Sequence, residues 1–102
     1  MTNKTMEEQR EILNTMSKQM AICGINQGYL DIRGLKYTMA NLKNFELNLK
    51  FKKNLTISCR YNEGNDLYEV DCYKGTNKIY SEERIFCEDW KNVFDRIWIK
   101  LM

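Results

Sequence analysis

The chain contains no histidine and no proline among its 102 residues. Histidine is the commonest general base and the commonest metal ligand near neutral pH, so its absence argues against acid–base catalysis and against a metal site. No apolar run approaches the roughly 20 residues that a membrane-spanning helix requires. Residues 1–4 lead directly into polar sequence, without the apolar segment of a secretory signal. We therefore expect a cytoplasmic protein that is not an enzyme, has no cofactor and does not contact a membrane.

Closely spaced cysteine pairs are also missing. The four cysteines, Cys23, Cys59, Cys72 and Cys87, are separated by 35, 12 and 14 residues. A structural zinc site usually has pairs only two to four residues apart, so this spacing does not favour one. A cytoplasmic chain of this length also does not need disulfides for stability. We expect reduced thiols, with Cys59 and Cys72 acting as small apolar residues in the core.

The net charge of +2 is small, but the charges are unevenly distributed along the chain. Residues 33–61 carry seven basic groups and one acid, for a net charge of +6. Residues 62–95 carry nine acids and four basic groups, for a net charge of −5. The length suffices for one domain, so we treat residues 1–102 as a single unit in which these two segments lie close together.

Both ends of the chain have helical patterns. Thr5 and Glu8 match a capping box, and apolar residues at helical spacing predict a helix over residues 6–22 that ends at Gly24. A wide apolar stripe predicts a second long helix over about residues 90–101. Three glycines interrupt residues 24–44. There we expect a short strand at residues 29–32 and a short helix containing Leu35, Met39 and Leu42, which are spaced i, i+4, i+7.

Apolar residues alternate with polar ones across residues 45–73, and Asn- and Gly-rich turns divide this stretch into strands. Four strands are predicted, at about residues 45–52, 55–61, 67–73 and 78–86. In the last strand Ile79 and Ile85 conflict in parity with Tyr80 and Phe86, which a β-bulge would resolve. The expected fold class is α+β, a four-stranded antiparallel meander flanked by an N-terminal helix and a C-terminal helix packed on one face.

No motif for phosphate binding or nucleophilic catalysis is present. The leading hypothesis is therefore a small protein-binding module that acts by protein–protein contact. In size, acidity and lack of motifs the chain resembles small phage inhibitors as a class, so an inhibitor or adaptor from a phage or mobile element is one form of this hypothesis. The acidic side chains proposed to contact the partner are Glu63, Asp66, Glu69, Asp71 and Glu82.

The alternative hypothesis is a small nucleic-acid-binding protein that uses a basic β-hairpin face. The basic residues expected on the outward face and tip of the first two predicted strands are Lys50, Lys52, Lys53 and Arg60. Exposed tyrosines beside them would suit single-stranded nucleic acid. A simpler explanation is that these cations pair with Glu69, Asp71 and Glu82 across the sheet.

The final helix carries more apolar surface than a single sheet can cover. This excess predicts self-association, with the chain acting as a homodimer or homo-oligomer. The residues expected to join the subunits are Trp98, Ile99, Leu101 and Met102. The alternative is that this apolar surface packs against the N-terminal helix.

Overall fold

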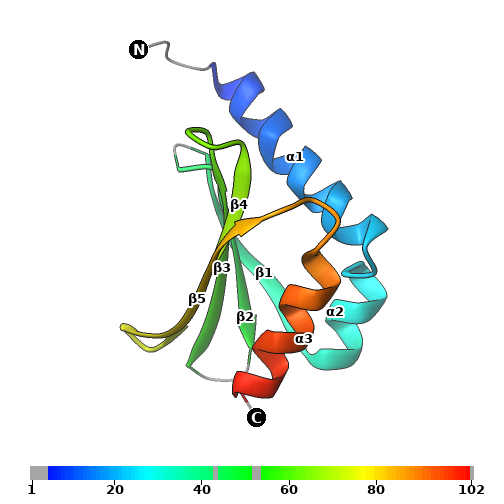
Figure 1. Cartoon of the computed structure of the whole chain (residues 1–102), viewed down its shortest axis with the longest axis vertical. Coiled ribbons are helices and arrows are strands. Elements are labelled where there is room, and N and C mark those ends of the chain that lie inside the picture. The colour runs from blue at the N-terminus through cyan, green and yellow to red at the C-terminus, as the bar shows by residue number, and fades with distance from the viewer. Residues whose placement is uncertain (1–4, 43, 52–53, 102) are drawn as a thin grey trace.

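The computed structural model describes residues 5–42, 44–51 and 54–101. The strands form one antiparallel sheet in chain order, and the three helices of this part of the chain lie on one face of the sheet (Figure 1). The α+β class and the antiparallel meander are confirmed, but the sheet has five strands where four were expected. The elements are α1 (Met6–Ile22), α2 (Gln27–Arg33), β1 (Leu35–Asn41), β2 (Glu46–Phe51), β3 (Leu55–Asn62), β4 (Leu67–Lys74), β5 (Asn77–Ile85) and α3 (Trp90–Leu101).

The predicted capping box begins α1. The Glu8 amide donates to Thr5 Oγ1 over 3.2 Å, and the Thr5 amide donates to Glu8 Oε1 over 3.1 Å. The helix closes where predicted, because Gly24 takes a φ of +98° and the Ile25 amide reaches back to the Met20 carbonyl. Both ends of α1 are therefore determined by local sequence.

The two predictions for residues 24–44 were wrong. Residues 29–32 belong to α2, which Asn26 caps by accepting from the Tyr29 amide and which Gly34 ends at a φ of +71°. Residues 35–41 form the edge strand β1, where a helix was expected. The register between β1 and β2 shifts between Tyr37 and Met39, so one extra residue interrupts the alternation. The inner positions of β1 are therefore 35, 37 and 40, which do not follow the two-residue period by which a strand is recognised.

The bulge predicted in the last strand is confirmed. The register between β4 and β5 shifts twice, so that Tyr80 lies opposite Cys72 and Ile85 lies opposite Tyr68. Ile85 is buried, whereas Phe86 lies just beyond the strand and is 54% exposed. The shifts allow residues of different parity to share the inner face of the sheet.

The core lies between the sheet and the helices. The indole of Trp90 packs on the rings of Tyr68 and Phe94, at centroid distances of 5.2 and 6.3 Å. Cys59 and Cys72 are buried thiols, and burial raises the pKa of Cys72 to about 12. Within the described residues, no helix has both the length and the apolar character that crossing a membrane requires.

Candidate functional site

Only one face of α1 packs on the rest of the molecule. Its buried residues are Leu13, Met16 and Met20, whereas Met6 in its first turn is 60% exposed. The helix is therefore anchored by its second half. A hollow lies along each flank of α1.

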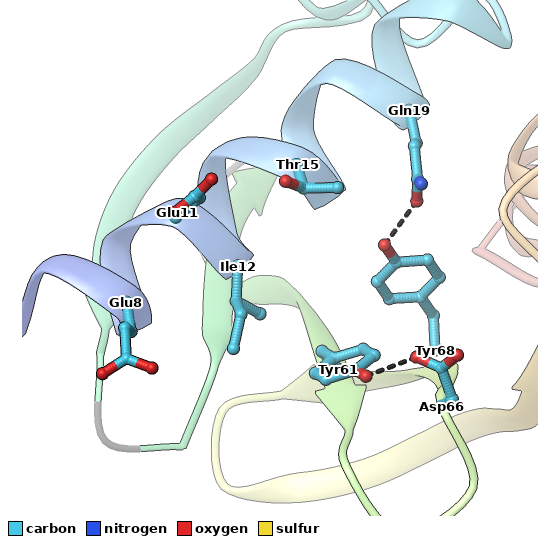
Figure 2. A pocket seen from close by; sticks show the side chains of 8 residues that line it. All are labelled: Glu8, Glu11, Ile12, Thr15, Gln19, Tyr61, Asp66 and Tyr68. Atoms are coloured by element: carbon cyan, nitrogen blue, oxygen red, sulfur yellow. Dashed lines mark hydrogen bonds between the residues drawn. The ribbon is translucent and has the colours of Figure 1, made fainter. Parts of the chain in front are cut away.

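The first hollow is a groove of about 340 Å³ between α1 and the turn that joins β3 to β4. Figure 2 shows α1 side chains from successive turns along one wall, with two tyrosines and an aspartate opposite them. We call it the acidic groove; its lining residues are Glu8, Glu11, Ile12, Thr15, Gln19, Tyr61, Asp66 and Tyr68. The α1 members are spaced i, i+3, i+4, i+7 and i+11, so they lie on one face of the helix.

Two hydrogen bonds order the wall opposite α1. The Tyr68 hydroxyl donates to Gln19 Oε1, and the Tyr61 hydroxyl donates to Asp66 (Figure 2). The pKa of Tyr61 is raised to about 12, chiefly by its bond to Asp66, and burial raises the pKa of Tyr68 to about 12. Both phenols therefore stay neutral at physiological pH, and they add no charge to the groove beyond that of its carboxylates.

Asp66 is held by the turn that connects β3 and β4. Its amide donates to the Asn62 carbonyl over 2.9 Å, and its φ is +58°. The Asn62 side chain accepts from the Gly64 amide over 2.8 Å, and the Asn65 side chain accepts from the Leu67 amide over 3.1 Å. The turn thus fixes the Asp66 carboxylate at the mouth of the groove.

The second hollow, of about 410 Å³, lies on the other flank of α1. It is more apolar, and its lining residues are Arg10, Leu13, Asn14, Ser17, Tyr37, Ala40, Leu42 and Leu47. Two grooves of different character therefore border one helix, and α1 separates them.

The five acids of the predicted partner-binding face lie in three places. Glu63 and Asp66 lie in or beside the β3–β4 turn, and only Asp66 lines the acidic groove. Glu69 and Asp71 lie on the outer face of β4. Glu82 bonds to Arg96 of α3, with an Nη2–Oε1 distance of 2.7 Å.

The predicted basic set is also divided. Arg60 lies among acids: its Nη2 is 3.0 Å from Glu69 Oε1, and its Nη1 bonds to Asp71. Lys50 is exposed on the outer face. Lys52 and Lys53 lie outside the described residues. Arg60 thus follows the simpler prediction of pairing across the sheet, because two carboxylates hold it.

The residues predicted for self-association differ in their surroundings. The Trp98 indole N–H donates to the Tyr29 hydroxyl over 2.6 Å, and its ring meets that of Phe51 edge-on at 4.8 Å. Ile99 is 79% exposed. Leu101 is the last residue of α3, and Met102 lies outside the described residues. Trp98 is thus packed within its own chain, whereas Ile99 faces solvent.

Sequence reasoning missed most of the acidic groove. A polar stripe at positions 8, 11, 15 and 19 of the predicted first helix was a usable signal, because it borders the apolar stripe. Its partners on β3 and β4 had no such signal. Gln19 and Tyr68 are 49 residues apart, and only packing brings them together.

Within the described part of the chain, no three Asp, Glu or Cys side chains gather in a way that would hold a metal ion. Fold and surface together define a two-layer α+β protein whose distinctive feature is a helix flanked by two grooves. No family model, no curated protein and no solved structure matches the chain.

Proposed function

We propose that the chain is a non-enzymatic protein-binding module that receives a basic segment of a partner protein in the acidic groove. The observation that supports this most directly is the composition of the groove, in which Glu8, Glu11 and Asp66 surround a partly buried isoleucine and two neutral phenols. Its volume of about 340 Å³ lies at the lower end of the usual range for binding pockets.

A lysine or arginine side chain suits this composition. Its aliphatic stem would lie against Ile12, since long basic side chains bury their stems along apolar surface. Its charged head would meet carboxylates, which accept strong hydrogen bonds from cations. The rings of Tyr61 and Tyr68, 5.7 Å apart at their centroids, add an aromatic surface that attracts cations.

The proposal extends to the role of an inhibitor or adaptor from a phage or mobile element. A small domain that presents fixed carboxylates imitates a nucleic-acid backbone, and basic nucleic-acid-binding proteins would accept it. The support is the small size of the chain and the carboxylates of the groove.

We also propose that copies of the chain associate through the end of α3. The support is Ile99, which is 79% exposed near the C-terminus of a helix whose earlier apolar residues, from Trp90 to Trp98, are packed. Light scattering after size exclusion would give about twice 12.3 kDa for a dimer. A monomeric mass at high concentration would remove this part of the proposal.

The groove can be tested without knowledge of the partner. A displayed library of random peptides is selected on the wild-type protein, and the binders are measured by calorimetry. We expect the selected sequences to be rich in lysine and arginine. The double variant Glu11→Gln/Asp66→Asn should weaken their binding about tenfold or more, which corresponds to about 1.4 kcal/mol.

The matched control removes two exposed carboxylates elsewhere, as Glu83→Gln/Glu88→Gln. It changes the net charge by the same amount. If both double variants weakened peptide binding equally, the binding would depend on the overall charge of the protein and not on the acidic groove. Asn at position 66 tolerates the left-handed backbone, so this substitution does not strain the turn. Selected peptides without basic residues would contradict the proposal.

A further inference from the structure

The outer face of the sheet, opposite the helices, carries a row of mainly basic side chains. The distribution of charge along the sequence did not predict this row. The strand register places one residue from each strand in line: Lys36 opposite Lys50, Lys50 opposite Thr56, Thr56 opposite Tyr73, and Tyr73 opposite Lys78. Neighbouring strands lie about 4.8 Å apart, so this row spans roughly 19 Å. We call it the basic row.

The acids of the outer face lie in other rows. Glu46, Arg60 and Glu69 line up four residues further along the middle strands, and Arg60 forms an ion pair with each of the two acids. Asp71 lies between the two rows, bonds to Arg60 and is only 4% exposed. Arg60 therefore pairs with these three acids of the outer face, while the basic row lies at the opposite end of the middle strands.

Lys36 and Lys50 face each other with no acid between them. Both are exposed, and neither forms an ion pair within the described residues. Like charges directly opposite on neighbouring strands destabilise a sheet. Folding alone gives no reason for this pair, whereas a bound polyanion would relieve its repulsion.

The other members of the row narrow the class of polyanion. Lys78 supplies a third cation at the far end, with its Nζ 3.7 Å from Asp71 and its side chain 53% exposed. Tyr73 is partly exposed beside it, and Thr56 carries a hydroxyl between the two basic ends. Cations along a line with an aromatic side chain among them match the way proteins hold single-stranded nucleic acid. An acidic peptide would use the lysines but would have no base to stack on the tyrosine.

We propose that the basic row is a binding site for single-stranded nucleic acid, in which Lys36, Lys50 and Lys78 contact phosphates and Tyr73 stacks on a base. This site differs from the predicted basic hairpin in two ways. It leaves out Arg60, which is bound to Glu69 and Asp71, and it adds residues from β1, β4 and β5. It lies on the opposite face from the acidic groove, so either proposal can fail while the other stands.

The test is fluorescence anisotropy with labelled oligothymidylate and oligouridylate of twelve nucleotides. At about 20 mM salt we expect binding, and three phosphate contacts should give a slope of about −2 for log K against log salt. The double variant Lys36→Gln/Lys50→Gln should reduce the slope to about −0.7, because one contact remains. Tyr73→Ser should weaken binding about fivefold or more with the slope unchanged, and Tyr73→Phe should bind as wild type.

The matched control is Lys18→Gln/Lys100→Gln, which removes two exposed lysines from the helices. The proposal would be overturned if this control weakened binding as much as Lys36→Gln/Lys50→Gln does. It would also be overturned if the wild-type protein did not bind the oligonucleotides at low salt. A duplex or an oligoglutamate that displaces the oligonucleotide at equal concentration would also overturn it. Thermal unfolding provides a separate check, because Lys36→Gln should leave the free protein as stable as wild type or slightly more stable.

Discussion

The two faces of the sheet bury residues by different means. On the inner face, Ile57 and Val70 are fully buried beneath the helices. Their immediate neighbours on the outer face, Ser58 and Asp71, are only 3% and 4% exposed although no helix of the described chain covers them. Adjacent residues of the same strands thus reach similar burial, and on the outer face the buried Asp71 is held by ion pairs.

The outer network depends on Arg60. A buried carboxylate is costly unless it is paired, and Asp71 is paired with Arg60 and with Lys78. Burial alone would lower the pKa of Arg60, but its bonds to Asp71 and Glu69 outweigh burial and raise that pKa. The bonds to these carboxylates thus offset the cost of burying the guanidinium. The comparison teaches that polar burial in this fold rests on a few ion pairs, whereas apolar burial is shared among many side chains.

The largest effect should follow from damage to the inner face. Phe94→Ala removes a fully buried ring that packs on Trp90 and Tyr29, and should lower the free energy of unfolding by about 3–5 kcal/mol. Urea denaturation followed by tryptophan fluorescence measures it. Ile32→Ala in α2 is the control, and should change stability by about 0.5 kcal/mol or less because that side chain is 84% exposed. Similar losses in both variants would contradict the assigned core.

A smaller effect should follow on the outer face. Arg60→Ala leaves Asp71 buried with only the longer contact to Lys78, and should cost about 1–3 kcal/mol in unfolding free energy. A double-mutant cycle with Asp71→Ala isolates the pair, and the double variant should lose less than the sum of the single losses. Arg10→Ala, at an exposed position of α1, serves as the control. Strict additivity in the cycle would show that Arg60 and Asp71 do not stabilise each other.

Local signals predicted those parts of the fold that are determined locally. The capping box at Thr5, the glycine at position 24 and the alternation through β2, β3 and β4 all correspond to observed elements. Residues 35–41 were mispredicted because the bulge in β1 breaks the period of two that identifies a strand. This segment joins the sheet by pairing with β2 across the bulge, and the residue pattern of β1 alone does not reveal that pairing.

The candidate sites were less predictable than the fold. The signs of the charged segments were visible in the sequence, but the register decides which charges meet. Arg60 lies opposite both Glu46 and Glu69, so the basic segment contributes its arginine to an acidic neighbourhood. Lys36 joined the basic row only because β1 is a strand. The acidic groove required α1 to pass over Tyr61 and Tyr68, which is a consequence of packing.

The smallest effect should come from a substitution of Glu82. This residue lies opposite Val70 on the inner face of the sheet and bonds to Arg96 of α3. Burial would raise the pKa of Glu82, but hydrogen bonds from Arg96 and Tyr80 outweigh burial and lower it below the ordinary value of 4.5. A carboxyl whose pKa is lowered by folding stabilises the folded state above its unfolded pKa. This contribution is lost as the pH falls through the folded pKa.

The wild-type free energy of unfolding should therefore decline below about pH 4.5, and the free energy of unfolding of Glu82→Gln should decline less steeply. At neutral pH the variant should lose about 1 kcal/mol or less, because Arg96 is half exposed. Urea titrations at several pH values measure both quantities, with Glu83→Gln as the control on the outer face. Parallel pH curves for wild type and Glu82→Gln would show that the bond to Arg96 adds nothing to the attachment of α3 to the sheet.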